Sequence, residues 1–108
     1  TDRPLQYGNG DWVFSGLRRP GEINNYIPEL TVEENPEYET VGGFMMERLG
    51  RIPDEGDTVP VPGGTLRVDA IDGRRVDRIR FIPDTAQTMY MRTVHARRDR
   101  TAAGEKRA

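Results

Sequence analysis

The segment from Thr65 to Ile82 constrains the fold of this chain more than any other, because its apolar residues recur at every second position. Leu66 and Val68 alternate with charged residues, and the same spacing returns at Ile79 and Phe81. A period of two is typical of a strand that has one buried and one solvated face. The segment therefore predicts an antiparallel β-hairpin with its apolar side chains on one face.

The turn of this hairpin decides which residues face each other. A two-residue loop at Asp72-Gly73 would place Val68 opposite Asp77 and mix apolar with charged residues on both faces. We therefore expect a four-residue loop from Asp72 to Arg75. It pairs Leu66 with Phe81, Val68 with Ile79, Asp69 with Arg78 and Arg67 with Arg80. Only Arg67 and Arg80 place like charges opposite each other, and their repulsion is small if this face of the hairpin is solvated.

Two short helices precede the hairpin. The first is predicted from Pro20, which suits a first helical turn, to about Ile27, where Pro28 ends it. The second is predicted between Thr40 as N-cap and Gly50 as a left-handed C-terminal cap. Each helix has one apolar face at helical spacing. These faces consist of Ile23, Tyr26, Ile27 and Leu30 in the first case, and of Val41, Phe44, Met45 and Leu49 in the second.

Shorter extended pieces complete the predicted domain. Residues 12–16 favour a strand, and 58–61 favour an extended segment that Pro60 confines to a sheet edge or a bulge. Residues 88–94 fit a strand or a helix equally well. We therefore expect one small α+β domain of two layers, with two short helices on a mainly antiparallel sheet. The expected boundaries are a leader at 1–9, a folded domain at 10–95 and a basic flexible tail at 96–108, and the turn signal Gly8-Asn9-Gly10 lies where the leader meets the first strand.

The composition excludes several classes of protein. Because the chain has no Cys, it has no disulfide, no thiolate nucleophile and no Cys-ligated metal site. The chain has a single histidine, His95. Any site that needs two or more imidazoles, such as a three-His metal site, therefore cannot be built from this chain alone. The longest apolar runs have three residues, whereas a membrane helix needs about 20. Since the chain begins at Thr1 without Met or a signal-like segment, we expect it to be a piece of a larger protein.

The net charge of −2 hides an uneven distribution. Residues 22–57 contain ten carboxylates and two arginines, a net charge of −8, whereas residues 92–108 carry +4. An acidic folded body repels phosphate backbones, which argues against nucleic-acid binding by the domain. For the basic tail, a solvated terminus is favoured over an arm that binds anionic lipid or nucleic acid.

Few residues suggest a chemical site. The acidic runs Glu33-Glu34 and 54–57 carry oxygen ligands for a hard cation, but they lack the spacing of a calcium loop and are better interpreted as a solvated acidic surface. Gly42-Gly43 at a helix start is the one candidate phosphate cradle, yet glutamates surround it in sequence, which favours close helix packing instead. Ser15 and His95 lack the context of a nucleophile or a general base.

Residues 38–57 closely resemble the central motif of the transporter-associated domain of CorC/HlyC-type proteins. The motif opens with an aromatic, an acidic residue and Thr-x-Gly-Gly, continues through a helix to Leu-Gly-x-Ile-Pro, and ends in a Gly-containing turn. The weaker resemblance of the flanks extends it to about residues 10–83. One departure is that Pro20-Gly21 and Asn24-Asn25 replace the usual Leu-rich first helix. The motif residues are Tyr38, Thr40, Gly42, Gly43, Leu49, Gly50, Ile52, Pro53 and Gly56.

The resemblance implies both a fold and a context. It implies an α+β domain similar to part of the FAD-binding PCMH-type fold, without bound FAD or any other cofactor. It also implies a position on the cytoplasmic face of the cell membrane, after a membrane domain and a pair of CBS domains, in proteins of Mg²⁺/Co²⁺ efflux or in hemolysin-like proteins. The family has no established catalytic residues, so none is assigned.

The function expected from this resemblance is a non-enzymatic regulatory or docking module. It would modulate cation transport through contacts with the neighbouring CBS and membrane domains, or with a second copy in a homodimer. The alternative is a sensor that binds a small molecule or a divalent cation at the Gly42-Gly43 helix end or at the acidic loops. An enzyme is a more distant possibility, which would require several carboxylates in one pocket and a raised pKa on one of them.

Overall fold

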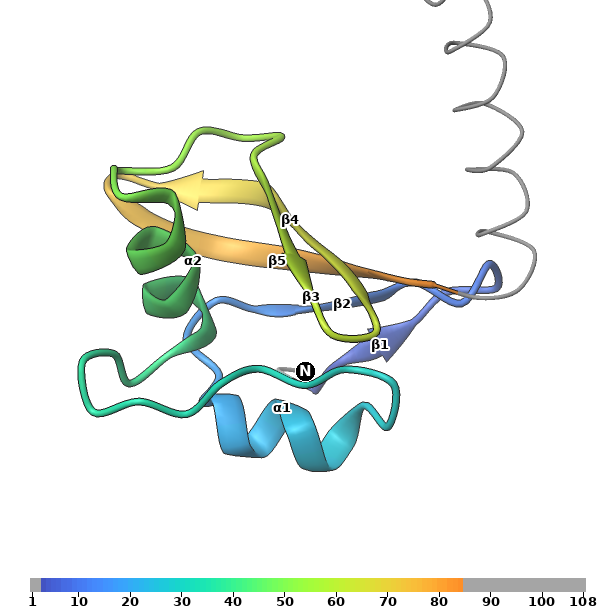
Figure 1. Ribbon diagram of the computed structural model, residues 1–108. Coiled ribbons are helices and arrows are strands. Elements are labelled where there is room, and N and C mark those ends of the chain that lie inside the picture. Colours follow the sequence, from blue (N-terminus) through green and yellow to red (C-terminus); the bar gives the residue numbers. More distant parts are fainter. Residues whose placement is uncertain (1–2, 85–108) are drawn as a thin grey trace, which may run out of the picture.

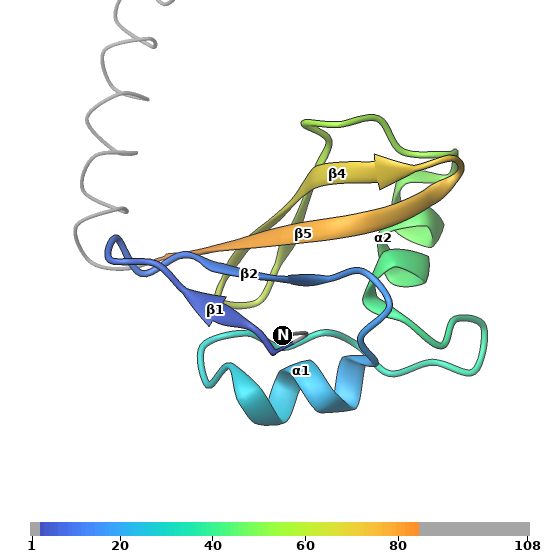
Figure 2. The same ribbon diagram turned by 180° about the vertical axis from the view of Figure 1, so that it is seen from behind.

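The computed structural model describes residues 3–84 and shows a five-stranded antiparallel sheet with two short helices (Figures 1 and 2). The order of the strands across the sheet is β1-β2-β5-β4-β3. The elements in chain order are β1 (Leu5–Gln6), β2 (Trp12–Ser15), α1 (Pro20–Tyr26), α2 (Val41–Leu49), β3 (Thr58–Val61), β4 (Gly64–Asp72) and β5 (Arg75–Pro83). This arrangement confirms the predicted α+β class.

The helices lie where the capping residues predict. Pro20 opens α1, and Ile27 caps its end directly before Pro28. The Thr40 side chain accepts a hydrogen bond from the backbone of Gly43 at the start of α2. Gly50 ends α2 in the left-handed conformation with φ 70°, as expected for a glycine cap.

One hydrophobic core joins the helices to a single face of the sheet. Ile23 and Ile27 of the first predicted face are buried, and Leu30 is buried although α1 has already ended. Tyr26 was expected on this face but is 44% exposed, so that part of the prediction is wrong. The sheet contributes alternate residues to the same core, among them Phe14, Val59, Leu66, Val68, Ile79 and Phe81.

The hairpin of β4 and β5 confirms most of the predicted register and corrects the rest. Leu66 pairs with Phe81, Val68 with Ile79 and Arg67 with Arg80. Asp69 does not pair with Arg78 as predicted, because Ala70 takes that place and the ladder then resumes at Ile71 and Val76. Asp72 pairs with Arg75, so the loop contains only Gly73 and Arg74. Asp69 of β4 and Asp77 of β5 have no partner in the ladder. Because one residue is left unpaired on each strand, the register from Ile71 and Val76 onward is the same as that before Asp69.

The sheet edges differ in part from expectation. Pro60 lies in β3, an edge strand as predicted, because proline has no N–H to donate to a further strand. Residues 5 and 6, expected to belong to a leader, form β1 and pair with Val13 and Trp12. The predicted turn at Gly8-Asn9-Gly10 joins the two strands. Residues 88–94, His95 and the basic tail lie outside the described residues.

Candidate functional site

The start of α2, with its motif glycines, is the first candidate site. Its leading N–H groups all have acceptors: Val41 donates to the Arg18 carbonyl (2.8 Å), Gly42 to the Gly16 carbonyl (2.9 Å), Gly43 to Thr40 Oγ1 (3.0 Å) and Phe44 to the Thr40 carbonyl (2.9 Å). Helix N-termini bind phosphate through unused N–H groups. Since these four donors are already bonded, they are not available to a phosphate.

Gly42 and Gly43 instead permit close packing. A Cβ atom on Gly42 would lie 2.9 Å from the carbonyl oxygen of Gly16 and 3.2 Å from the Cβ of Val76. A Cβ on Gly43 would lie 3.1 Å from the Cβ of Tyr38. The structure therefore supports the packing interpretation, with α2 pressed against β5 and the end of β2.

Tyr38 connects the segment before α2 to the helix itself. Its hydroxyl donates a hydrogen bond to the carbonyl oxygen of Glu33, and its ring meets Phe44 edge to face at 5.5 Å. Burial, followed by the nearby carboxylate of Glu33, raises the pKa of Tyr38. The Glu33 carboxylate pairs with Arg48, whose guanidinium lies 4.9 Å from the centre of the Phe44 ring. This motif aromatic therefore holds a loop in place.

The carboxylates of the acidic turn after α2 are paired with an arginine from the same turn. Arg51 Nη1 lies 2.8 Å from Asp57 Oδ2 and 3.5 Å from Asp54 Oδ2. The N–H of Asp54 also donates to Asp57 Oδ2 at 2.7 Å. The hydrogen bond from Arg51, and next that from Asp54, lowers the pKa of Asp57. Gly56 makes this turn at φ 93° and donates its N–H to the carbonyl of Val68, which anchors the turn to β4.

The remaining motif residues continue this helix and turn. Leu49 is partly buried against the core, and Pro53 is buried. Ile52, between them, is 49% exposed. No group of three or more His, Cys, Asp or Glu side chains within residues 3–84 is placed to hold a metal ion. The Ser15 hydroxyl accepts a hydrogen bond from the N–H of Leu17 at 3.1 Å and so shapes a turn.

A groove opens at the same end of the domain, and sequence reasoning missed it. The α2 groove, as we call it, has a volume of about 470 Å³. It lies between the turn after β2, the first turns of α2 and the β4–β5 turn. Its side-chain lining includes Leu17, Met46, Asp72, Arg74 and Arg75. The charged residues within four positions of Gly42-Gly43 in sequence are Glu39 and Glu47, so Arg74 and Arg75 come close to the start of α2 through the fold alone.

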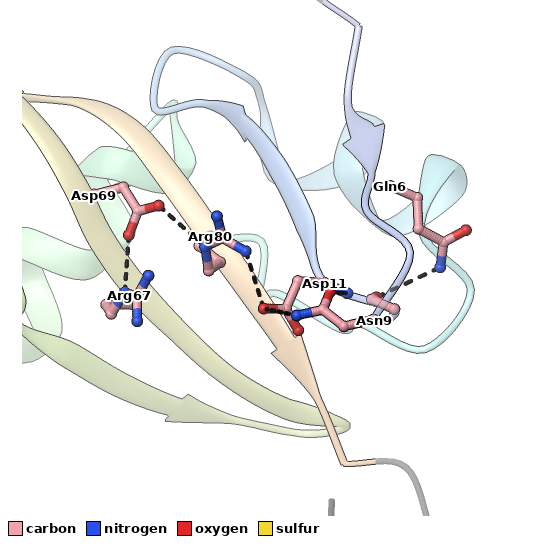
Figure 3. A network of polar contacts seen from close by, with 7 residues as sticks. Gln6, Asn9, Asp11, Arg67, Asp69 and Arg80 are labelled. Carbon is pink, nitrogen blue, oxygen red and sulfur yellow. Dashed lines mark hydrogen bonds and ion pairs between the residues drawn. The ribbon is translucent and has the colours of Figure 1, made fainter.

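A charged network on the uncovered face of the sheet was also not predicted (Figure 3). Asp69 accepts hydrogen bonds from Arg67 Nε at 2.8 Å and from Arg80 Nε at 3.1 Å. Arg80 Nη1 donates to Asp11 Oδ2 at 3.0 Å, and its guanidinium stacks over the Tyr7 ring at 4.8 Å. Burial opposes ionisation of Asp69, but the hydrogen bonds from both arginines prevail and lower its pKa. Asp69 thus separates two arginines that face each other in the ladder.

The described residues form a small α+β domain, a five-stranded antiparallel sheet with helices packed on one face and with charged side chains engaged mainly in structural contacts. Residues 6–85 match the family of the transporter associated domain, CorC_HlyC, and the chain belongs to that family. A solved structure supports the fold: the putative Mg²⁺ and Co²⁺ transporter (CorC) associated region from Neisseria meningitidis has a TM-score of 0.67 and 23% identity. That likeness covers 76% of this chain and 99% of the other.

Curated relatives share part of their sequence with this chain. YegH of Escherichia coli K12 is 33% identical over 75 residues, which are 69% of this chain and 14% of YegH. The polyamine export protein of the same organism is 38% identical over 71 residues, 63% of this chain and 15% of that protein. The magnesium and cobalt efflux protein CorC of Salmonella typhimurium is 28% identical over 80 residues, 73% of this chain and 27% of CorC. The chain therefore spans between about a seventh and a quarter of the length of these relatives.

No helix within residues 3–84 is long and apolar enough to cross a membrane.

Proposed function

We propose that this chain is a regulatory or docking module of a membrane cation transporter. The observation that carries the proposal is its membership of the transporter associated domain family, together with its small share of the relatives' length. A domain of this size, matched within much longer proteins, works as one part of a larger assembly.

The proposal for the class of transported substrate rests on the names of two relatives. Two of them are named for export of polyamines and for efflux of magnesium and cobalt, and all of these substrates are cations. We infer that the parent protein of this chain exports a cation, either a divalent metal or an organic polyamine.

The proposed mode of action is contact between proteins without catalysis. Asp69 and Asp57 each form ion pairs with arginines, whose hydrogen bonds lower the pKa of these carboxyl groups, the reverse of what a general acid requires. The proposed partners are CBS and membrane domains of the parent protein at the cytoplasmic face, or a second copy in a homodimer. Coupling would arise because the module binds one arrangement of these domains better than another.

Deletion of residues 3–84 from the parent protein tests this proposal. We expect the membrane part to remain folded and inserted, and export of Mg²⁺, Co²⁺ or a polyamine to change in rate or in its response to substrate level. Unchanged export in every one of these respects would contradict a regulatory role.

Calorimetry distinguishes docking from sensing. The 108-residue chain would be titrated with ATP, FAD, Mg²⁺ and spermidine. We expect no saturable heat with any of these compounds. The N–H groups at the start of α2 are already bonded, which disfavours the anionic ATP and FAD, and no group of three or more His, Cys, Asp or Glu side chains within residues 3–84 is placed to hold Mg²⁺. A saturable heat with one of them would contradict the docking proposal and favour a sensor.

A further inference from the structure

We propose that the α2 groove is a docking surface for an acidic peptide segment that carries an apolar side chain. The inference rests on the proposed function of a docking module, and it names the surface and the chemistry of the partner. Three features of the groove support it: an exposed apolar side chain on a fixed turn, two exposed arginines at the rim, and the contrast between these positive charges and the net negative charge of segment 22–57.

The apolar contact would be made by Leu17. Its side chain is 52% exposed, although the turn that presents it is tightly bonded. The N–H groups of Leu17 and Arg18 donate to the side chain and the carbonyl of Ser15, both at 3.1 Å, and the N–H of Gly16 donates to the carbonyl of Asp77 at 3.1 Å. A partner that covers Leu17 therefore loses little entropy in ordering this backbone.

The floor beside Leu17 suits an adaptable apolar contact. Met46 of α2 lines the same groove and is only partly buried. Methionine is flexible and polarizable, so it adjusts to the shape of an incoming side chain. The backbone of Gly42 and Gly43 also lines the groove. An apolar residue of a partner can therefore lie across the backbone between Leu17 and Met46.

The charge at the rim selects an acidic partner. Arg74 is exposed and has no ion-pair partner among residues 3–84. Arg75 pairs with Asp72 at 3.0 Å, but these side chains are 55% and 68% exposed, and an ion pair so accessible to water contributes little free energy. A carboxylate of the partner can therefore displace Asp72. Segment 22–57 contributes only uncharged residues to the groove lining, namely Thr40, Gly42, Gly43 and Met46, so its net charge of −8 lies on other surfaces and disfavours the same partner there.

Nuclear magnetic resonance of the ¹⁵N-labelled 108-residue chain tests the proposal. The probe is the synthetic peptide Gly-Ser-Glu-Glu-Leu-Glu-Glu-Leu-Gly-Ser. Two comparison peptides replace every Glu by Lys or every Leu by Ser. We expect the first peptide to shift the amide signals of Leu17, Gly42, Gly43 and Arg74 in a saturable manner, and the other two to shift them far less.

Variants separate this groove from other surfaces. Leu17→Ser and the double variant R74E/R75E should each weaken binding of the acidic peptide by about tenfold or more, which is the scale of one lost contact in an interface. Arg78→Glu is the matched control, because it makes the same type of charge change on an exposed residue of β5 outside the groove. It should weaken binding by less than about threefold at physiological salt, where charges beyond a Debye length are screened.

Three outcomes would overturn the inference. One is equal binding of the acidic and basic peptides, and another is unchanged affinity in both groove variants. The third is a dimer of the free chain, measured by analytical ultracentrifugation, that dissociates in Leu17→Ser, since a second copy would then be the occupant. If the groove binds the peptide but deletion of the domain leaves export unchanged, only the proposed function fails. If deletion changes export but the groove variants bind normally, only this inference fails.

Discussion

Replacement of Gly42 by Ala tests how closely α2 packs against the sheet. In an exposed first turn of a helix this change would stabilise the protein by no more than about 0.5 kcal/mol, because alanine has the higher helix propensity. Here the new methyl group would lie 2.9 Å from the carbonyl oxygen of Gly16 and 3.2 Å from the Cβ of Val76. Both neighbours belong to the backbone or its first side-chain atom, so neither can rotate away.

The expected cost exceeds the gain in propensity. Overpacking of a filled core costs about 1–3 kcal/mol. A shift of α2 that relieved the contact would also lengthen the hydrogen bond from Gly42 to Gly16, now 2.9 Å, whose loss costs about 1 kcal/mol. After the propensity gain, we expect a net destabilisation of about 2 kcal/mol, which corresponds to a decrease in Tm of about 8–16 °C for a domain of this size.

The matched control is Gly21→Ala in α1. A Cβ there would lie 3.2 Å from the carboxylate end of Glu34, an exposed side chain that can move. We expect this variant to be as stable as the parent or more stable by about 0.5 kcal/mol, since Gly21 is in the first turn, where propensity counts less than in the interior. Urea unfolding followed by circular dichroism measures both variants, with an unchanged m value as the sign of an intact fold. If Gly42→Ala were as stable as Gly21→Ala, the close packing of α2 would be refuted.

Three further predictions concern stability. The pKa of Asp69 is lowered in the folded state, so its contribution to folding stability is complete above its unfolded pKa of about 3.9 and is lost as the pH falls through the folded value. Below about pH 4, acid titrations should therefore show a smaller loss of stability in Asp69→Asn than in the parent. Asn24→Ala should destabilise the chain by about 2 kcal/mol in urea unfolding, because the Asn24 amide makes two hydrogen bonds, of 2.7 and 2.8 Å, to the backbone of Val32. An unchanged midpoint would show that these bonds contribute nothing to stability. Thr40→Ala removes the N-cap of α2 and should cost about 1 kcal/mol, measured as a shift of the thermal midpoint, whereas Thr40→Ser should retain most of the stability.

Local patterns predicted those elements whose causes lie close together in sequence. The second helix is an example, because Thr40 and Gly50 mark its ends and the four apolar residues between them share one face. The hairpin is another, since alternation alone fixed the pairs Leu66–Phe81 and Val68–Ile79. The family motif falls on this helix and the turn that follows, and its glycines and prolines have local structural reasons.

Contacts between distant segments could not be predicted in the same way. The sequence pattern left Arg67 opposite Arg80 as an uncompensated pair, because a regular ladder has no place for a carboxylate between them. The bulge supplies that place: Asp69 leaves the ladder and bonds both arginines. Asp11, separated from Arg80 by 69 positions in the chain, completes the network. A periodic pattern contains no signal for an irregularity that depends on a tertiary ion pair.

The α2 groove likewise forms between segments that are distant in sequence. Of the charged surfaces described, it is the one where a partner would displace the fewest existing contacts. On the uncovered sheet face, Arg80 and its two carboxylates are each less than a fifth exposed and satisfy one another. In the acidic region, Arg51 is bonded to Asp57. A partner at the sheet-face network would first have to break these buried ion pairs and would regain only part of that free energy, and a partner at the turn of residues 51–57 would have to displace the contact of Arg51 with Asp57. At the α2 groove, Leu17 is half exposed, and the one ion pair that the groove residues form within residues 3–84 is open to water, so less is lost on binding there.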